Sequence, residues 1–376
     1  MRTTMDPSNR SAILCFSHLR WEFVWQRPQH LLSRAAAEYD VFFLEEAIRC
    51  PVELPFLKKI PVADGIEVLQ LHVPLQMPEL EVEALLKAAA QGAVSGRSRV
   101  ILWFYTPMAL PWSDGLDAAF VVYDCMDDLA GFRGASPDMK RREHELMGFA
   151  DLVLTGGVSL FEARRGRHHN LHLFPSSVDA AHFAKARQTS IEPHDQVKIP
   201  APRIGYFGVI DERLDYSLIA KLAALKPEWQ LVLLGPTAKI DASELPRASN
   251  IHWLGQKPYE ELPDYLRGWS AGFMPFALNE ATRYISPTKT PEFLAAGLPV
   301  VSTEIKDVER AYGDVVAIAS DADGFADALD KAMRGSDAAW KSAVDTKLAS
   351  QSWDRTWADI ARLLPCQTVQ RELQHV

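Results

Sequence analysis

The sequence has few cysteines, and they are far apart. Cys15, Cys50, Cys125 and Cys366 are the four cysteines of the 376-residue chain, and no Cys-x-x-Cys pair occurs. Zinc ribbons and disulfide-stapled secreted domains need cysteines at short, regular spacings. The sequence therefore predicts neither a zinc site nor a disulfide framework, and it favours a reducing, cytoplasmic compartment.

Long hydrophobic runs are also missing. The polar N-terminus leads into an apolar run over residues 12–16, which is too short for the core of a signal peptide. No segment approaches the roughly 18 uninterrupted apolar residues of a membrane helix. We therefore expect neither a signal peptide nor a membrane span, while peripheral attachment to a membrane stays open.

Positive charge is in deficit. The chain has 40 Lys and Arg against 49 Asp and Glu, a net charge of −9. Because a nucleic-acid-binding domain usually carries a broad basic surface, nucleic acid is not an expected partner. Any phosphate site must therefore be local.

The length is about two to three times that of a typical domain, enough for two cores.

Short apolar runs alternate with longer amphipathic segments along almost the whole chain. This alternation predicts parallel sheets covered on both faces by helices. Strands are expected at residues 12–16, 41–44, 100–104, 120–123 and 152–155, and then at 203–207, 230–234, 251–253, 272–275, 300–302 and 315–318. Amphipathic helices are expected at residues 28–38, 80–91, 137–149, 216–225 and 323–334.

A polar, proline-containing segment, residues 184–202, separates the two series of strands. It predicts an interdomain linker. The first domain would cover residues 1–190 and the second 191–350, followed by a C-terminal helical segment within 351–376. Two doubly wound domains joined in this way would form a cleft outside the carboxyl ends of their strands.

One segment places a lysine and a glutamate at the start of an apolar helix. Within residues 286–302, Lys289 and Glu292 are three residues apart. Residues at this spacing share one helix face, and the free N–H groups of a first helical turn favour a phosphate. Lys289 could add a point charge to that phosphate, and Glu292 could accept hydrogen bonds from ribose hydroxyls. The alternative is a surface ion pair on an ordinary helix.

This segment resembles the donor-site motif of GT-B glycosyltransferases, in particular the retaining group 1 type. That family typically carries Pro-x-Lys-x-x-Glu-x-x-Ala-x-Gly-x-Pro-Val, and this chain matches the motif from Pro287 to Val300. Many members have a second glutamate eight positions before the ribose-binding one, where this chain has Tyr284. The resemblance covers about residues 12–320 and implies two Rossmann-like domains facing across a cleft.

The resemblance also implies a donor site formed by loops of the second half. Arg213, near the end of the first loop, would meet the diphosphate, although pairing with Asp211 or Asp215 is the plain alternative. Ser286 could bind the donor or serve only as a helix cap. The expected donor-binding residues are Gly208, Arg213, Gly235, Gly255, Lys257, Ser286, Thr288, Lys289 and Glu292.

Large polar and aromatic residues crowd the loop over residues 17–30, a composition typical of a binding site. We expect the acceptor there, held by Arg20, Trp21, Trp25 and Arg27. His18 could approach the reacting centre. Asp127, at the end of a strand, would be the general base of an inverting enzyme, whereas a retaining enzyme could use the departing phosphate itself.

These residues predict transfer of a sugar from a nucleotide-diphosphate sugar, with a UDP-sugar favoured. The acceptor would be a saccharide or a lipid-linked glycan in bacterial polysaccharide synthesis. Arg213 and Lys289 would stabilise charge on the leaving diphosphate. We expect neither an essential metal nor a cofactor. Two alternatives stay open, a nucleotide-sugar epimerase and a non-catalytic protein with the same fold.

Overall fold

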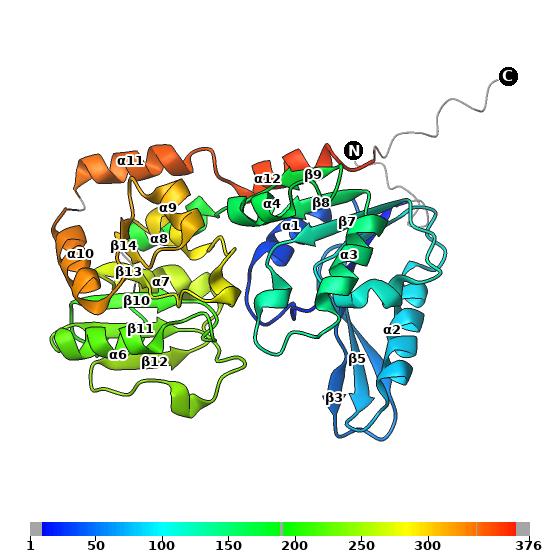
Figure 1. The fold of residues 1–376 in the computed structure, drawn as a ribbon, viewed down its shortest axis with the longest axis horizontal. Coiled ribbons are helices and arrows are strands. Elements are labelled where there is room, and N and C mark those ends of the chain that lie inside the picture. Colours follow the sequence, from blue (N-terminus) through cyan, green and yellow to red (C-terminus); the bar gives the residue numbers. More distant parts are fainter. Residues whose placement is uncertain (1–9, 189–190, 336, 366–376) are drawn as a thin grey trace.

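Two α/β domains, each with its own sheet, lie side by side in the computed structural model (Figure 1). The structure describes residues 10–188, 191–335 and 337–365. Part of the predicted C-terminal segment, residues 366–376, therefore lies outside the described residues. Each domain contains the alternating strands and helices that the apolar pattern predicted.

The first domain is built on a largely parallel sheet. Its strand order is β3-β5-β2-β1-β6-β7-β8-β9, and β4 pairs antiparallel with β5. The strands are β1 (Ala12–Ser17), β2 (Asp40–Glu45), β3 (Ile48–Cys50), β4 (Phe56–Ala63), β5 (Ile66–Pro74), β6 (Val100–Phe104), β7 (Phe120–Cys125), β8 (Leu152–Thr155) and β9 (Leu171–Leu173). The helices are α1 (Arg27–Ala35), α2 (Glu79–Val94), α3 (Met139–Phe149) and α4 (Val158–Arg164), with 3₁₀ turns η2 (Pro107–Ser113) and η3 (Leu129–Gly131).

Side chains of the central strand β1 alternate between two hydrophobic layers, as the twofold period of a strand requires. Leu14 and Phe16 pack in the layer that contains α2 and α3. Ile13 and Cys15 pack in the opposite layer, which contains α1 and the C-terminal helix α12 (Trp353–Ala361). The sheet is thus covered on both faces.

The second domain has a fully parallel sheet in the order β12-β11-β10-β13-β14-β15, the order of doubly wound nucleotide-binding sheets. Its strands are β10 (Arg203–Phe207), β11 (Gln230–Leu234), β12 (Ile251–Gly255), β13 (Ala271–Met274), β14 (Val300–Ser302) and β15 (Ala317–Ile318). Its helices are α5 (Ala180–Ala184), α6 (Tyr216–Leu225), α7 (Leu262–Arg267), α8 (Lys289–Ala295), α9 (Lys306–Tyr312), α10 (Ala322–Gly335) and α11 (Ala338–Leu348), with 3₁₀ turns η4 (Lys185–Arg187), η5 (Ala242–Glu244), η6 (Tyr259–Glu261) and η7 (Glu280–Thr282).

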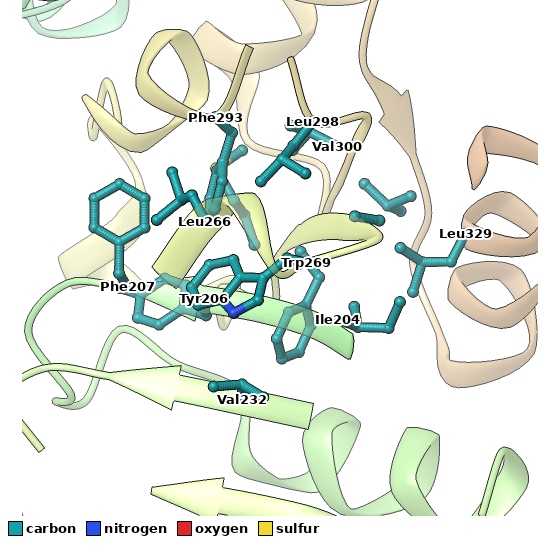
Figure 2. Packing of buried hydrophobic residues seen from close by; sticks show 14 of the residues in the cluster. Ile204, Tyr206, Phe207, Val232, Leu266, Trp269, Phe293, Leu298, Val300 and Leu329 are labelled. Carbon is teal, nitrogen blue, oxygen red and sulfur yellow. The ribbon is translucent and has the colours of Figure 1, made fainter. Parts of the chain in front are cut away.

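Aromatic packing fixes the helix that carries the lysine–glutamate motif. Phe293 of α8 is fully buried, and its ring meets the edge of Phe207 at a centroid distance of 5.0 Å. Trp269 packs beside both rings (Figure 2). Because Phe207 is the last residue of β10, this contact holds α8 against the carboxyl end of that strand.

Within the residues that the structure describes, the chain crosses between the domains twice. Phe174 packs against the core of the first domain, whereas Val178 is already buried in the core of the second. The return lies between Leu348 in the second core and Trp353 in the first. Helix α12 then packs on α1, where the rings of Trp353 and His30 stack at 4.6 Å.

The described residues of the segment predicted as a linker, 184–188 and 191–202, pack within the second domain. Ala186 is part of the second core, and Gln196 is fully buried, where it bonds the Tyr265 carbonyl and the Trp269 indole N–H. The structural crossing therefore comes before residue 190. Prolines interrupt the periodicity of this segment, but its side chains still find partners in the domain that follows.

Candidate active site

A cavity of about 510 Å³ lies between the two domains. One wall comes from the second domain, at the carboxyl ends of β10 and β11, and includes Gly208, Gly235 and Lys289. The other wall comes from the first domain, through residues 21–25 and the β4 residues 60–62. Open α/β sheets bind ligands at such strand ends.

Two glycines let the backbone form the wall of this cavity. Gly208 has φ 148° and Gly235 has φ 145°, conformations that favour glycine. A Cβ atom on Gly235 would lie only 1.7 Å from the carbonyl oxygen of Gly208. Neither position tolerates a side chain in this geometry, so bare backbone faces the cavity.

Lys289 and Glu292 form an ion pair beside these glycines. The Lys289 Nζ lies 2.8 Å from the Glu292 Oε2, and their side chains are only 14% and 6% exposed. Burial raises the pKa of the Glu292 carboxyl, and the Lys289 charge opposes that rise. The Lys289 Nζ also lies 4.7 Å from the centroid of the Phe207 ring. The motif thus places a little-hydrated cation on the cavity wall.

Arg213 adopts the pairing that the sequence left as an alternative. Its Nε and Nη2 donate to the Asp211 carboxylate at 2.9 and 2.7 Å. Its guanidinium carbon lies 5.5 Å from the ring centroid of Phe132, which belongs to the first domain. Arg213 therefore reaches the domain interface while it is held by Asp211.

The remaining predicted donor residues divide into two groups. Lys257 lines the cavity and pairs with Asp195 at 2.6 Å. Gly255, Ser286 and Thr288 are not among the cavity-lining residues. Ser286 instead faces the first domain, where a Cβ atom on Gly157 would lie 2.7 Å from the Ser286 Cβ.

Two residues expected to bind the acceptor form ion pairs with buried carboxylates. Arg20 donates to the fully buried Glu45 carboxylate at 3.0 Å. Arg27 and Asp124 are both fully buried, and the Arg27 Nε lies 2.9 Å from each carboxylate oxygen. A buried carboxylate needs such a cation, because an unpaired charge in the interior costs several kcal/mol. Arg27 is therefore not accessible to an acceptor in this structure.

The aromatic part of the same loop faces the second domain. Trp21 and Trp25 both line the cavity, and the Trp25 ring stacks on Tyr259 at 5.9 Å. The Gln256 side chain donates to the carbonyl oxygen of Phe23. The loop thus touches the donor-side residues, and not only a separate surface of the first domain. Sequence reasoning missed these partners because more than 200 residues separate them.

The pKa values of His18 and Asp127, the two predicted catalytic residues of the first domain, are both shifted. Burial and the charge of Lys239 lower the pKa of His18 to about 4. Burial raises the pKa of Asp127 to about 6, against the opposing charge of Arg213. Lys239, which the sequence reasoning did not select, has φ 57°, and its Nζ lies 5.7 Å from the centroid of Phe132.

One Asp-x-Asp pair occurs in the sequence, away from the residues that line the cavity. Asp321 and Asp323 form an Asp-x-Asp pair, but Asp321 accepts from the Gly324 N–H at the start of α10. Among the described residues, no three His, Cys, Asp or Glu side chains gather as a metal site.

None of the helices that the structure describes has both the length and the apolar character to span a bilayer.

Comparison with known sequences matches the second domain to a family. Residues 201–334 match the family described as glycosyl transferases group 1. TuaH of Bacillus subtilis (strain 168), named provisionally as a teichuronic acid biosynthesis glycosyltransferase, is 28% identical over 246 residues. That match covers 61% of this chain and 60% of the relative, so it spans about three fifths of each.

Solved structures share the arrangement of both domains. An E. coli structure described as trehalose-6-phosphate bound with UDP-2-fluoro glucose is 13% identical, with a TM-score of 0.66 over 94% of this chain and 98% of that one. Sucrose-phosphate synthase from Thermosynechococcus elongatus is 16% identical, with a TM-score of 0.67 and the same coverages. These likenesses confirm the predicted GT-B fold.

The pKa of Asp127 generates a stability prediction. Its folded-state value of about 6 lies above the ordinary 3.8, so the folded protein retains a proton that the unfolded chain has lost. Its contribution to stability is present below pH 3.8 and is lost as the pH rises through 6. Asp127→Asn should therefore raise the free energy of unfolding at pH 8 by about 2 kcal/mol, with the gain vanishing near pH 4.

Urea denaturation between pH 4 and pH 8 measures this difference. Asp128→Asn is the neighbouring control, because Asp128 pairs with Arg164 at 2.8 Å and its removal should not stabilise the protein. If Asp127→Asn instead lowers the free energy of unfolding at pH 8, the ionised Asp127 carboxylate does not destabilise the folded protein, and the prediction is wrong.

Proposed function

We propose that this chain, a member of the group 1 glycosyltransferases, transfers a sugar from a nucleotide-diphosphate sugar to a saccharide or a lipid-linked glycan. The observation that carries the proposal is Lys289, which is paired with Glu292 and lies on a cavity wall that also contains the bare backbone of Gly208 and Gly235. A diphosphate can approach such a backbone closely, and it would meet a cation there.

Binding would exchange one partner of the ion pair for the donor. The diphosphate would take Lys289 as its counter-ion, leaving the Glu292 carboxylate to accept hydrogen bonds from ribose hydroxyls. Arg213 would supply a second, forked donor set near the same strand end. The UDP-sugar bound in a structure of the same fold and the polysaccharide role named for TuaH support a UDP-sugar and a polysaccharide acceptor.

Catalysis would be mainly electrostatic. As the bond between the sugar and the diphosphate breaks, its electron pair moves to a phosphate oxygen, and the charges of Lys289 and Arg213 stabilise it. In a retaining, metal-independent reaction that oxygen would also take the acceptor proton. Asp127 is the residue that would take it in an inverting reaction. The acceptor would approach from the first domain, on the side of His18 and Asp127.

Tyr284 gives the non-catalytic alternative its one structural support. It stands where the family often has a glutamate, and it packs against the core of the first domain. Arg283 covers its ring at 5.2 Å. A protein that binds UDP-sugars, but neither hydrolyses them nor transfers the sugar to any offered glycan, would fit this alternative better.

Replacing the ion pair should weaken nucleotide binding. Lys289→Met and Glu292→Gln each remove a hydrogen bond from a charged group, which typically costs about 1.5–3 kcal/mol. We expect UDP affinity, measured by calorimetry, to fall at least tenfold in each variant. Lys226→Met is the matched control, because Lys226 pairs with Asp330 at 2.7 Å and does not line the cavity. Unchanged affinity for UDP and GDP in both variants would contradict the donor-site assignment.

The aromatic loop should also contribute to donor affinity. Trp25 lines the cavity and supports Tyr259, so Trp25→Ala should weaken UDP binding by roughly 1 kcal/mol, the scale of one aromatic pair. Trp340→Ala, at a tryptophan that does not line this cavity, serves as the control. If Trp25→Ala lowers transfer but leaves UDP affinity intact, the loop serves the acceptor, as the sequence first suggested.

A further inference from the structure

Three consecutive residues of the first domain, 131–133, lie against the second domain, and we call them the bridging loop. A Cβ atom on Gly131 would lie 2.7 Å from the Glu280 carbonyl oxygen, so the two backbones approach closely there. The backbone N–H of Arg133 donates to the Glu212 carboxylate at 2.7 Å. The phenylalanine between these two contacts is therefore held against the second domain.

The ring of this phenylalanine contacts two cations of the second domain. The guanidinium carbon of Arg213 lies 5.5 Å from the centroid of the Phe132 ring, and the Lys239 Nζ lies 5.7 Å from it. Cations are attracted to the face of an aromatic ring. Phe132 is half-buried and is not part of the hydrophobic cores that the described residues form. Its position is therefore explained by the two charges and not by core packing.

Both cations lie on loops that leave the cavity wall. Gly208 and Gly235 line the cavity, and the chain segments that follow them run side by side. The Ile210 N–H donates to the Pro236 carbonyl oxygen at 2.9 Å, and the Ala238 N–H donates to the Ile210 carbonyl oxygen at 3.0 Å. The two loops thus lead from the glycine wall to a pair of cations at the first domain.

The guanidinium group of Arg213 is fixed on two sides and open on a third. Asp211 accepts from its Nε and Nη2 at 2.9 and 2.7 Å, and the Phe132 ring covers its face. The Arg213 Nη1, which carries two of the five N–H donors, makes no hydrogen bond to the residues that the structure describes. Lys239 likewise forms no ion pair with any described residue. This arrangement can hold an anion at the free edge of Arg213.

We propose that Phe132 is a positioning residue of the donor site, whose ring directs the free edge of Arg213 toward the donor diphosphate. The inference rests on the proposed nucleotide-sugar donor. A group that is already held in place loses less freedom when it binds a ligand, so the ring should raise the affinity for a diphosphate. Because Phe132 belongs to the first domain, this contribution is present only while the bridging loop lies against the second domain.

Calorimetry with UDP tests this role. Phe132→Leu keeps an apolar side chain but removes the ring, so UDP affinity should fall about fivefold, the scale of one partly buried cation–π contact. Phe132→Tyr retains the ring and should restore most of the wild-type affinity. Phe149→Leu is the matched control, because Phe149 is another phenylalanine of the first domain and is 46% exposed at the surface. If GDP binds in place of UDP, the same comparison uses GDP.

A double-mutant cycle shows whether the ring acts through Arg213. Arg213→Gln should itself weaken UDP binding, because it removes the cation that the ring positions. In that background Phe132→Leu should cause little further loss, since residues that act on one another have non-additive effects. A purely structural role would instead give the same loss in both backgrounds.

The outcomes separate this inference from the function on which it rests. Unchanged or tighter UDP binding by Phe132→Leu, an equal loss in Phe132→Tyr, or an equal loss in both Arg213 backgrounds would overturn the positioning role and leave the nucleotide site in place. Failure of the wild-type protein to bind UDP or GDP would overturn the proposed function and this inference together. A loss that depends on Arg213 and is restored by Phe132→Tyr would support both.

Discussion

The proposed donor site depends on an ion pair that is largely excluded from solvent. Lys289 and Glu292 lie 2.8 Å apart at the start of α8, with little of either side chain exposed. Burying two such charges costs several kcal/mol for each ion before their attraction is counted. A pair of hydrophobic residues could fill the same space without this desolvation cost. The pair is therefore better explained by a ligand that needs both a cation and a hydrogen-bond acceptor at one place.

The surrounding fold keeps this pair where two strands end. Phe293 anchors α8 in the second core, and Phe207 underlies the Lys289 ammonium group. Gly208 and Gly235 bring the ends of β10 and β11 together and leave their backbone open to the cavity. Sequence order, core packing and backbone conformation therefore together place Lys289, Gly208 and Gly235 on one wall of the cavity.

The first domain supplies the opposite wall and is tied to the second by polar contacts. The Asp307 carboxylate of α9 accepts from the Ser159 backbone N–H at 3.0 Å, at the start of α4. Glu212 accepts from the Arg133 backbone N–H at 2.7 Å. Such contacts resemble the polar interfaces that allow domains to move relative to each other. Closure around a donor would exclude water from the activated sugar.

Local sequence patterns predicted the repeating strands and helices well. The strand at residues 203–207 and the helix at 216–225 have the predicted bounds, because each carries a clear period between turn residues. Strands β4 and β5 were not predicted, although β5 alternates buried and partly buried residues. Charged and proline-containing segments lie beside these strands, so a search for short, fully apolar runs did not detect them.

The site was predictable only where its residues are close in sequence. Lys289 and Glu292 are one helical turn apart, so their spacing alone placed them together. Arg27 gives no local sign that its partner is Asp124, 97 positions away. The contact between Trp25 and Tyr259 likewise depends on how two domains pack. Residue type marked residues 17–30 as unusual, but only the tertiary structure divides them into partners of buried carboxylates and residues of a cavity wall.

Amide hydrogen exchange with and without UDP tests most directly whether both walls hold one nucleotide. The account predicts that UDP slows exchange at residues 289–292 of the second domain and also at residues 21–25 of the first. Slowing confined to the second domain, with residues 21–25 unchanged at saturating UDP, would contradict it. The aromatic loop would then take no part in holding the donor.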